Sequence, residues 1–262
     1  MSENRHPLGL RTLFFTEMWE RMSYYGMRGI LVLFMTASIT NGGLDFNNAS
    51  ASAIYGIYAA AVYLMALPGG WIADNIFGQQ KTILFGGIVI MFGHLSLAIP
   101  NMTFFYLGLI LVVIGTGLLK PNISAIVGGL YEKKTSLRES GFTIFYMSIN
   151  IGSILGFFIC GYLGENIGWH YGFGAAGIGM FLGVLQYKLN LNSLGEVGLL
   201  PANQVSEERK KQYKKNTLII SGIISLFIFS GLFGFWKINP VPLASVLTFI
   251  IGSISLIYFL YL

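Results

Sequence analysis

Eight apolar runs separated by short polar segments dominate this sequence and restrict it to very few folds. The runs lie near residues 13–37, 51–73, 82–99, 104–129, 141–163, 169–190, 217–236 and 241–262. A helix of about 20 apolar residues crosses the hydrocarbon core of a bilayer. Only 10% of the residues are charged, whereas a soluble domain carries roughly 25%. The sequence therefore predicts an all-α polytopic membrane protein with about eight transmembrane spans.

Lysine and arginine are concentrated in alternate connections between these runs. The connections 41–50, 100–103 and 164–168 contain neither residue. The opposite set holds Arg5, Arg11, Lys81, Lys133, Lys134, Arg138, Lys188 and the cations of the run 208–215, with Lys237 as the one exception. Because cytoplasmic loops are rich in lysine and arginine, we expect a cytoplasmic N-terminus in the cytoplasmic (inner) membrane. The net charge of +5 is then a signal of topology, and no nucleic-acid partner is expected.

The runs fall into two groups along the chain. Residues 1–190 hold six closely spaced spans, which we predict to form one bundle. Residues 191–216 are polar and basic, and they predict a cytoplasmic linker. Residues 217–262 hold two further spans without an acidic residue, a composition typical of helices that face lipid.

The first apolar run contains an unusual stripe of charge. Glu17, Arg21, Tyr24 and Arg28 are spaced as residues on one face of a helix, and Glu20 stands beside them. Charge at membrane depth is costly, and it marks a functional site by default. The stripe is expected to face protein or a water-filled cavity. Alternatively, Glu17 and Arg21 form a purely structural pair at the favourable i, i+4 spacing.

Two cations in apolar runs suggest an anionic ligand. Arg28 has no acidic partner on its own helix, and arginine recognises a carboxylate through two parallel hydrogen bonds. Lys120 stands just before Pro121 and is predicted to face Glu17 and Glu20 across the bundle. When a lysine lies beside carboxylates, the protonation of these carboxylates depends on whether the lysine is paired with them or with another group. This dependence is the basis of a proton-coupled switch. The plain alternative for Lys120 is that its side chain extends to the membrane surface.

Asp74 and Lys81 flank a short turn between the second and third runs, in GGWIADNIFGQQKTI. This turn contains three glycines, and it is expected on the cytoplasmic side. The two charges are interpreted as a conformational latch rather than as a ligand site.

Three polar residues in apolar runs carry weaker predictions. Asn150 either faces a ligand or only joins helices, and Gly152 and Gly156 after it predict a close helix contact. Tyr63 either lines a cavity or fills space between helices. His94 stands alone in its run and is predicted to be a satisfied core residue rather than a proton relay.

No motif for catalysis or cofactor binding is found. The sequence lacks G-x-S-x-G, H-E-x-x-H and a Walker loop. Cys160 is the only cysteine, so neither a disulfide nor a cysteine-based metal site can form within the chain. We therefore expect no enzyme, no metal site and no cofactor.

Several of these segments, in this order, resemble the proton-dependent oligopeptide transporter (POT) family of the major facilitator superfamily. Glu17, Glu20 and Arg21 form the family's E-x-x-E-R motif, followed by YYGMRG. The segments GGWIADNIFGQQKTI, GTGLLKPNIS and FTIFYMSINIGSILG follow in the order expected for the family. The resemblance covers roughly residues 1–190, and it implies the N-terminal six-helix bundle of a major facilitator fold plus two extra transmembrane helices.

The resemblance implies symport of di- and tripeptides with protons, the protons being the coupling ion. The proton-coupling residues would be Glu17, Glu20, Arg21 and Lys120. The substrate-binding residues would be Arg28, Tyr24, Tyr25, Tyr63, Lys120 and Asn150.

The family fold has two six-helix bundles with the substrate between them, whereas this chain shows only the first. A separately encoded C-terminal bundle is therefore an expected partner, besides the peptide, protons and the lipid bilayer. The alternatives are a truncated, transport-inactive remnant, a membrane subunit that needs a second bundle, and a relative that carries nitrate or another small anion.

Overall fold

The computed structural model describes residues 5–132, 135–203, 205–235 and 239–261. Within these ranges the regular structure is entirely helical, in agreement with the prediction of an all-α chain. The long helices are α1 (Leu8–Thr36), α2 (Asn48–Ile72), α3 (Gln79–Leu97), α4 (Met102–Leu130), α5 (Arg138–Asn166), α6 (Trp169–Leu189), α7 (Glu207–Leu232) and α8 (Pro240–Tyr261). Lys133, Lys134 and Lys237, which contribute to the predicted topology, lie outside the described residues.

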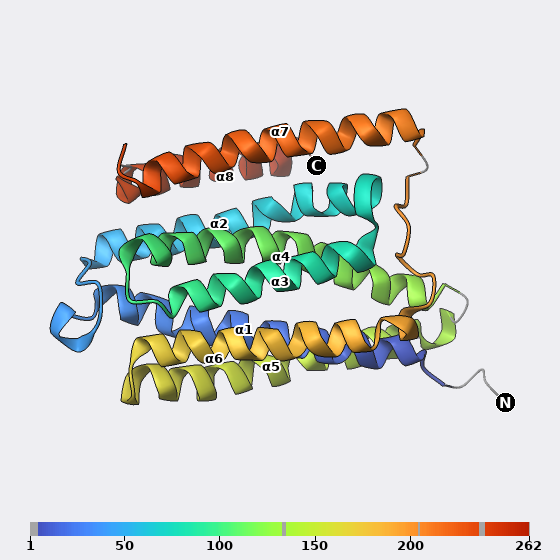
Figure 1. The fold of residues 1–262 in the computed structure, drawn as a ribbon, viewed down its shortest axis with the longest axis horizontal. Coiled ribbons are helices and arrows are strands. Elements are labelled where there is room, and N and C mark those ends of the chain that lie inside the picture. Colours follow the sequence, from blue (N-terminus) through green and yellow to red (C-terminus); the bar gives the residue numbers. More distant parts are fainter. Residues whose placement is uncertain (1–4, 133–134, 204, 236–238, 262) are drawn as a thin grey trace.

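The first six long helices pack into one bundle, and the last two run along its side. The closest pairings are α1 with α5 and α6, α3 with α4 and α6, and α2 with α4. Figure 1 shows all eight helices nearly parallel to one long axis, with α7 and α8 beyond α2. This arrangement leaves α1 between α5, α6 and α2, so α1 is the helix best placed to carry polar side chains.

Six of the described helices are long and apolar enough to cross a membrane, counting α2 with the π-helical turn Ala73–Phe77 that continues it. The helices α1 and α6 do not meet this criterion. In α1 the cause is the stripe of charge, and the structure buries 18 of its 29 residues against other helices. A helix that contacts protein on most sides tolerates polar residues, because they need not face lipid.

Glycine allows α1 and α5 to approach closely. A Cβ atom on Gly152 would lie 2.3 Å from the Met18 carbonyl oxygen, and one on Gly156 would lie 2.4 Å from that of Met22. No side chain fits at such distances. The predicted close contact through Gly152 and Gly156 is therefore observed, and it fixes α5 against the charged stripe.

Residues 191–199, which follow α6, pack under one end of the bundle. Leu194 is only 2% exposed, and Ser193 forms a 2.6 Å hydrogen bond with Thr12 of α1. Gln80 Nε2 donates to the carbonyl oxygens of Gly195 and Val197, at 3.0 and 2.9 Å. These contacts join the ends of α1 and α3.

The last two helices lie outside the bundle and are not buried by it. No residue of α7 is buried, and α8 packs along α2. The Ser206 hydroxyl caps α7, which begins at Glu207. The basic run 208–215 therefore forms the first turns of α7, although the sequence suggests a linker up to residue 216.

Candidate functional site

Three charged residues of α1 lie together inside the bundle. The side chains of Glu17, Glu20 and Arg21 are at most 4% exposed. Arg21 Nε lies 2.9 Å from Glu17 Oε1 and 2.5 Å from Glu20 Oε2. Glu17 precedes Arg21 by one helical turn, which favours an ion pair. The structure thus joins the three side chains in one cluster, which we call the ion cluster.

Part of the ion cluster has no hydrogen-bond partner in the part of the chain that the structure describes. Glu17 Oε2, Glu20 Oε1 and Arg21 Nη2 are buried and unpaired there. The two contacts of Arg21 Nε bring charges together without the alignment of a hydrogen bond. Buried polar groups are normally hydrogen-bonded. The unpaired atoms of the ion cluster can therefore still accept a proton or form a hydrogen bond with another polar group.

Lys120 of α4 is half-buried and lies beside Tyr63 of α2. Its Nζ atom is 4.7 Å from the centroid of the Tyr63 ring, a cation–π distance. The lysine is near enough to Glu20 for the two charges to interact. No ion pair within 4.0 Å joins Lys120 to Glu17 or Glu20 among the described residues. Lys120 is thus free to engage a different anion.

Arg28, two turns beyond the ion cluster, is held by a tyrosine of α2. Its Nε atom donates a short hydrogen bond to the Tyr55 hydroxyl. Its guanidinium carbon lies 5.2 Å from the centroid of the same ring. The sequence analysis missed Tyr55, although Tyr55 and Tyr63 are spaced to share a face of α2. Arg28 stays partly exposed, so its remaining donors are available to an anion.

Two adjacent tyrosines continue the stripe on α1. The Tyr24 ring lies 5.3 Å from the Arg21 guanidinium carbon and is 5% exposed, so it covers the ion cluster. Tyr25 is half-buried and contacts Tyr24 edge to face at 5.4 Å. Its other ring neighbour is Phe157 of α5, at 6.2 Å. Tyr25 thus lies at the border between the buried cluster and the α5 surface.

Tyr58 of α2 is a second residue that the sequence analysis missed. It is 4% exposed, and its hydroxyl has no hydrogen-bond partner in the described ranges. The hydroxyl lies near enough to interact electrostatically with Glu20, Arg28 and Arg21. The i, i+3 spacing of Tyr55 and Tyr58 is the signal that could have found it.

Asn150 and Tyr63 are both exposed at the surface of the bundle. Tyr63 is 64% exposed, and Asn150 of α5 is also exposed. Asn150 is four residues from Tyr146 and seven from Phe157, so the three share one helix face. This face runs from the start of α5 to Phe157, which contacts Tyr25 of α1. Asn150 therefore shares a face of α5 with a neighbour of Tyr25.

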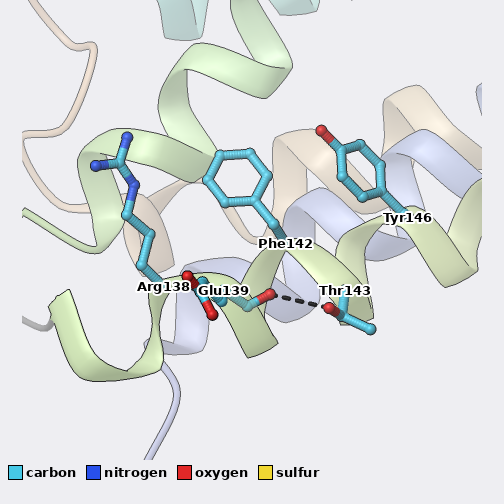
Figure 2. A pocket seen from close by; sticks show the side chains of 5 residues that line it. All are labelled: Arg138, Glu139, Phe142, Thr143 and Tyr146. Atoms are coloured by element: carbon cyan, nitrogen blue, oxygen red, sulfur yellow. Dashed lines mark hydrogen bonds between the residues drawn. The ribbon is translucent and has the colours of Figure 1, made fainter.

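An open pocket of about 540 Å³ lies at the start of this α5 face. Figure 2 shows Arg138, Phe142 and Tyr146 along one side of the helix, one turn apart. The Arg138 guanidinium carbon lies 6.0 Å from the Phe142 ring centroid. The Thr143 hydroxyl donates to the Glu139 carbonyl oxygen at 3.0 Å. The sequence analysis did not single out this pocket.

Asp74 and Lys81 are not joined in the structure. Asp74 is half-buried in the π-helical turn Ala73–Phe77, and its backbone oxygen accepts a hydrogen bond from Asn203, 2.9 Å away. Lys81 is exposed in the first turn of α3. No ion pair between the two is present in the described chain. A latch at these residues stays a prediction.

His94 meets one expectation only in part. It is completely buried in α3, and neither ring nitrogen has a hydrogen-bond partner within the described residues. The prediction of a core histidine is therefore confirmed, whereas the hydrogen bonds expected of a satisfied one are not found among the described residues. A sequence shows that a histidine lies in an apolar run, but not whether an acceptor from another helix reaches it.

Comparison with known proteins shows which transporters this chain is similar to. Residues 80–191 match the family model described as the POT family. The peptide transporter YePEPT of Yersinia enterocolitica is 41% identical over 98% of this chain and 52% of its own length. The di-/tripeptide transporter of Lactococcus lactis is 42% identical over 89% of this chain and 47% of its own length.

A solved structure agrees with these relatives. The crystal structure of a peptide transporter POT in complex with sulfate matches at a TM-score of 0.86 and 40% identity, over 97% of this chain and 52% of that one. The chain spans about half the length of the curated relatives it matches. The eight long helices of the described residues and these matches together show a multi-pass membrane protein that carries a POT family domain over residues 80–191 and is similar, over about half of their length, to POT transporters.

Proposed function

We propose that this chain is one half of a proton-coupled symporter of di- and tripeptides. The observation that carries the proposal is the buried ion cluster, beside which Arg28 and Lys120 keep donors available to an anion. Relatives named as a peptide transporter and a di-/tripeptide transporter support a peptide as the substrate class. Catalysis and a bound cofactor have no part in the proposal.

Proton coupling is assigned to Glu17, Glu20, Arg21 and Lys120. Two carboxylates beside one guanidinium leave one negative charge in excess inside the bundle. An uncompensated buried charge costs several kcal/mol, so either a proton or the ammonium of Lys120 must balance it. When Lys120 turns to a substrate carboxylate, a proton takes its place at the cluster. Peptide and proton binding are coupled in this way.

Substrate binding is assigned to the same region of the bundle. Arg28 and Lys120 would bind the peptide carboxylate, because a guanidinium and an ammonium both stabilise that group. The hydrogen bond from Arg28 to Tyr55 fixes the direction of the guanidinium. The side chains proposed to line the rest of the site are Tyr24, Tyr25, Tyr63 and Asn150.

The same proposal includes the orientation of the chain in the membrane, a conformational latch at Asp74 and Lys81, and the division of the chain into three parts. In Figure 1 the N-terminal end, the turn between α2 and α3, and the start of α7 lie at one end of the molecule. The cations of these segments support a cytoplasmic position for that end, in the cytoplasmic membrane. Asp74 and Lys81 would act there as a conformational latch. The proposed units are a bundle over 1–190, a linker over 191–216 and two helices over 217–262.

A second candidate is a membrane subunit, or an inactive remnant, that requires a separate C-terminal bundle. The exposure of Tyr63 and Asn150 favours it, since both polar side chains lie on a face that a second bundle could cover. A nitrate or small-anion relative is a third candidate, because it would use the same two cations. A carrier of small anions, however, has no need of two buried carboxylates.

Reconstitution in liposomes tests these candidates. The chain is reconstituted alone and together with the C-terminal half of the Lactococcus lactis di-/tripeptide transporter, and uptake of labelled dialanine is measured under an inward proton gradient. Uptake that depends on both halves supports a half-transporter. If the halves co-purify and no uptake follows, the proposal fails. Competition by unlabelled dipeptide, but not by nitrate, separates the peptide symporter from the anion carrier.

A further inference from the structure

The first turns of α7 carry a dense group of cations that the proposed transport does not use. Five basic residues stand within seven positions, and we call them the α7 basic cluster: Arg209, Lys210, Lys211, Lys214 and Lys215. From Asn216 to Leu232 the same helix has no charged residue. The helix is apolar enough to cross a membrane. It therefore passes from a cationic segment into an apolar one without an intervening loop.

The charges of the α7 basic cluster are largely unneutralised. The one ion pair found for it in the described chain joins Lys210 Nζ to Glu207 Oε1 at 3.7 Å, and that glutamate is 80% exposed. The other four cations are exposed. Lys210 and Lys214, like Lys211 and Lys215, are spaced four apart, and like charges at this spacing destabilise a helix. A negatively charged partner would remove this repulsion.

A pair of aromatic rings fixes the level of the α7 basic cluster relative to the bundle. The Tyr213 ring contacts the Trp71 ring at the end of α2, edge to face, with 5.2 Å between centroids. Tryptophan and tyrosine are enriched where a membrane meets water. Lys210, Tyr213 and Thr217 are the partly buried positions on this part of α7, so Lys210 shares the face of α7 that turns to Trp71. The cations thus surround an aromatic contact of the kind found at headgroup level.

We propose that the α7 basic cluster binds the headgroups of anionic phospholipids in the leaflet at this end of the bundle. Clusters of lysine and arginine next to a membrane-spanning helix attract anionic lipids through charge complementarity. Figure 1 shows the start of α7 beside the end of α2, where Tyr213 contacts Trp71. Basic residues that only determine the topology can lie anywhere in a cytoplasmic loop. They need not be spaced four apart on one helix beside two aromatic rings, as they are here.

The test compares two charge-matched variants of the full chain, purified in an uncharged detergent. The first is Lys210→Gln, Lys211→Gln, Lys214→Gln and Lys215→Gln together. The control is Arg11→Gln, Lys81→Gln, Arg138→Gln and Lys188→Gln together, which removes the same charge elsewhere. Native mass spectrometry measures binding of phosphatidylglycerol and phosphatidylcholine, and inorganic phosphate is added as a competitor.

The proposal expects the unmodified chain and the control to prefer phosphatidylglycerol, and expects the first variant to lose roughly tenfold or more in this preference. An equal loss in both variants, or no loss in the first, overturns it. Displacement of the lipid by millimolar phosphate overturns it as well, because the site would then bind a free anion. If the first variant is not monodisperse, the double variant Lys211→Gln and Lys215→Gln, at two exposed positions, must show a smaller loss of the same sign. None of these results depends on transport.

Discussion

The Nε atom of Arg21 lies 2.5 Å from Oε2 of Glu20, its neighbour in the chain, inside a bundle that leaves both side chains almost inaccessible to solvent. Consecutive residues of a helix point about 100° apart, so this contact requires the arginine side chain to bend towards Glu20. In this position the same atom is 2.9 Å from Glu17 Oε1. One guanidinium therefore stabilises two buried carboxylates.

Replacing Arg21 should damage stability more than replacing either acid. Arg21→Gln leaves two carboxylates close together without a buried cation, and breaking a buried ion pair costs about 3–5 kcal/mol. We expect a marked fall in the thermal unfolding midpoint of the chain in detergent. Arg11→Gln, at an exposed position of the same helix, should change the midpoint little. Adding Glu20→Gln to Arg21→Gln should recover part of the loss, and a midpoint unchanged by Arg21→Gln alone would contradict the role of the ion cluster.

Replacing Glu20 should separate proton coupling from substrate binding. Glu20→Gln keeps the shape of the side chain but removes its charge and its ability to release a proton. In the two-half assembly, gradient-driven dipeptide uptake should fall to background, whereas exchange of labelled for unlabelled dipeptide without a gradient should persist. Glutamine at position 20 with full gradient-driven uptake would show that Glu20 is not the coupling group.

The sequence predicts the parts of this site that one helix determines. Glu17 and Arg21 are one turn apart, so their contact follows from helical spacing alone. The partner of Arg28 does not, because Tyr55 reaches it from α2, and the rotation of α2 relative to α1 depends on packing across the whole bundle. The unmet part of the expectation at His94 has the same origin. A sequence places the histidine in a helix, whereas its hydrogen-bond partners depend on neighbouring helices.

The fold, like the site, is only partly predicted by the sequence. The apolar runs predict the eight helices because each run satisfies its backbone hydrogen bonds internally. They do not predict that residues 191–199 pack under the bundle, since that segment is held by single contacts such as the hydrogen bonds from Gln80. Nor do they predict that α7 begins at Glu207, because the charge of its first turns suggests a loop.

Removing the Tyr55 hydroxyl should weaken substrate binding without unfolding the protein. Tyr55→Phe keeps the ring beside Arg28 but removes the hydrogen bond to its Nε atom. Hydrogen bonds to charged groups contribute about 1.5–3 kcal/mol, so the apparent KM for dipeptide in the two-half assembly should rise roughly tenfold or more. Tyr162→Phe, at a position of α5 that is 64% exposed, is the matched control and should leave KM unchanged. An unchanged KM for Tyr55→Phe would show that this hydrogen bond does not orient Arg28 for substrate.

Two glycines of α5 should respond in opposite ways to the same substitution. A Cβ atom on Gly152 would lie 2.3 Å from the Met18 carbonyl oxygen, and α1 cannot yield there without displacing Arg21, whose own Cβ would be 2.8 Å away. Gly152→Ala should therefore lower stability by about 1–3 kcal/mol or more, seen as a lower unfolding midpoint. Gly161→Ala meets no atom within 4 Å, and alanine favours a helix over glycine by up to about 1 kcal/mol, so its midpoint should stay or rise. Equal midpoints for the two variants would contradict the close contact of α1 and α5 that holds the ion cluster in place.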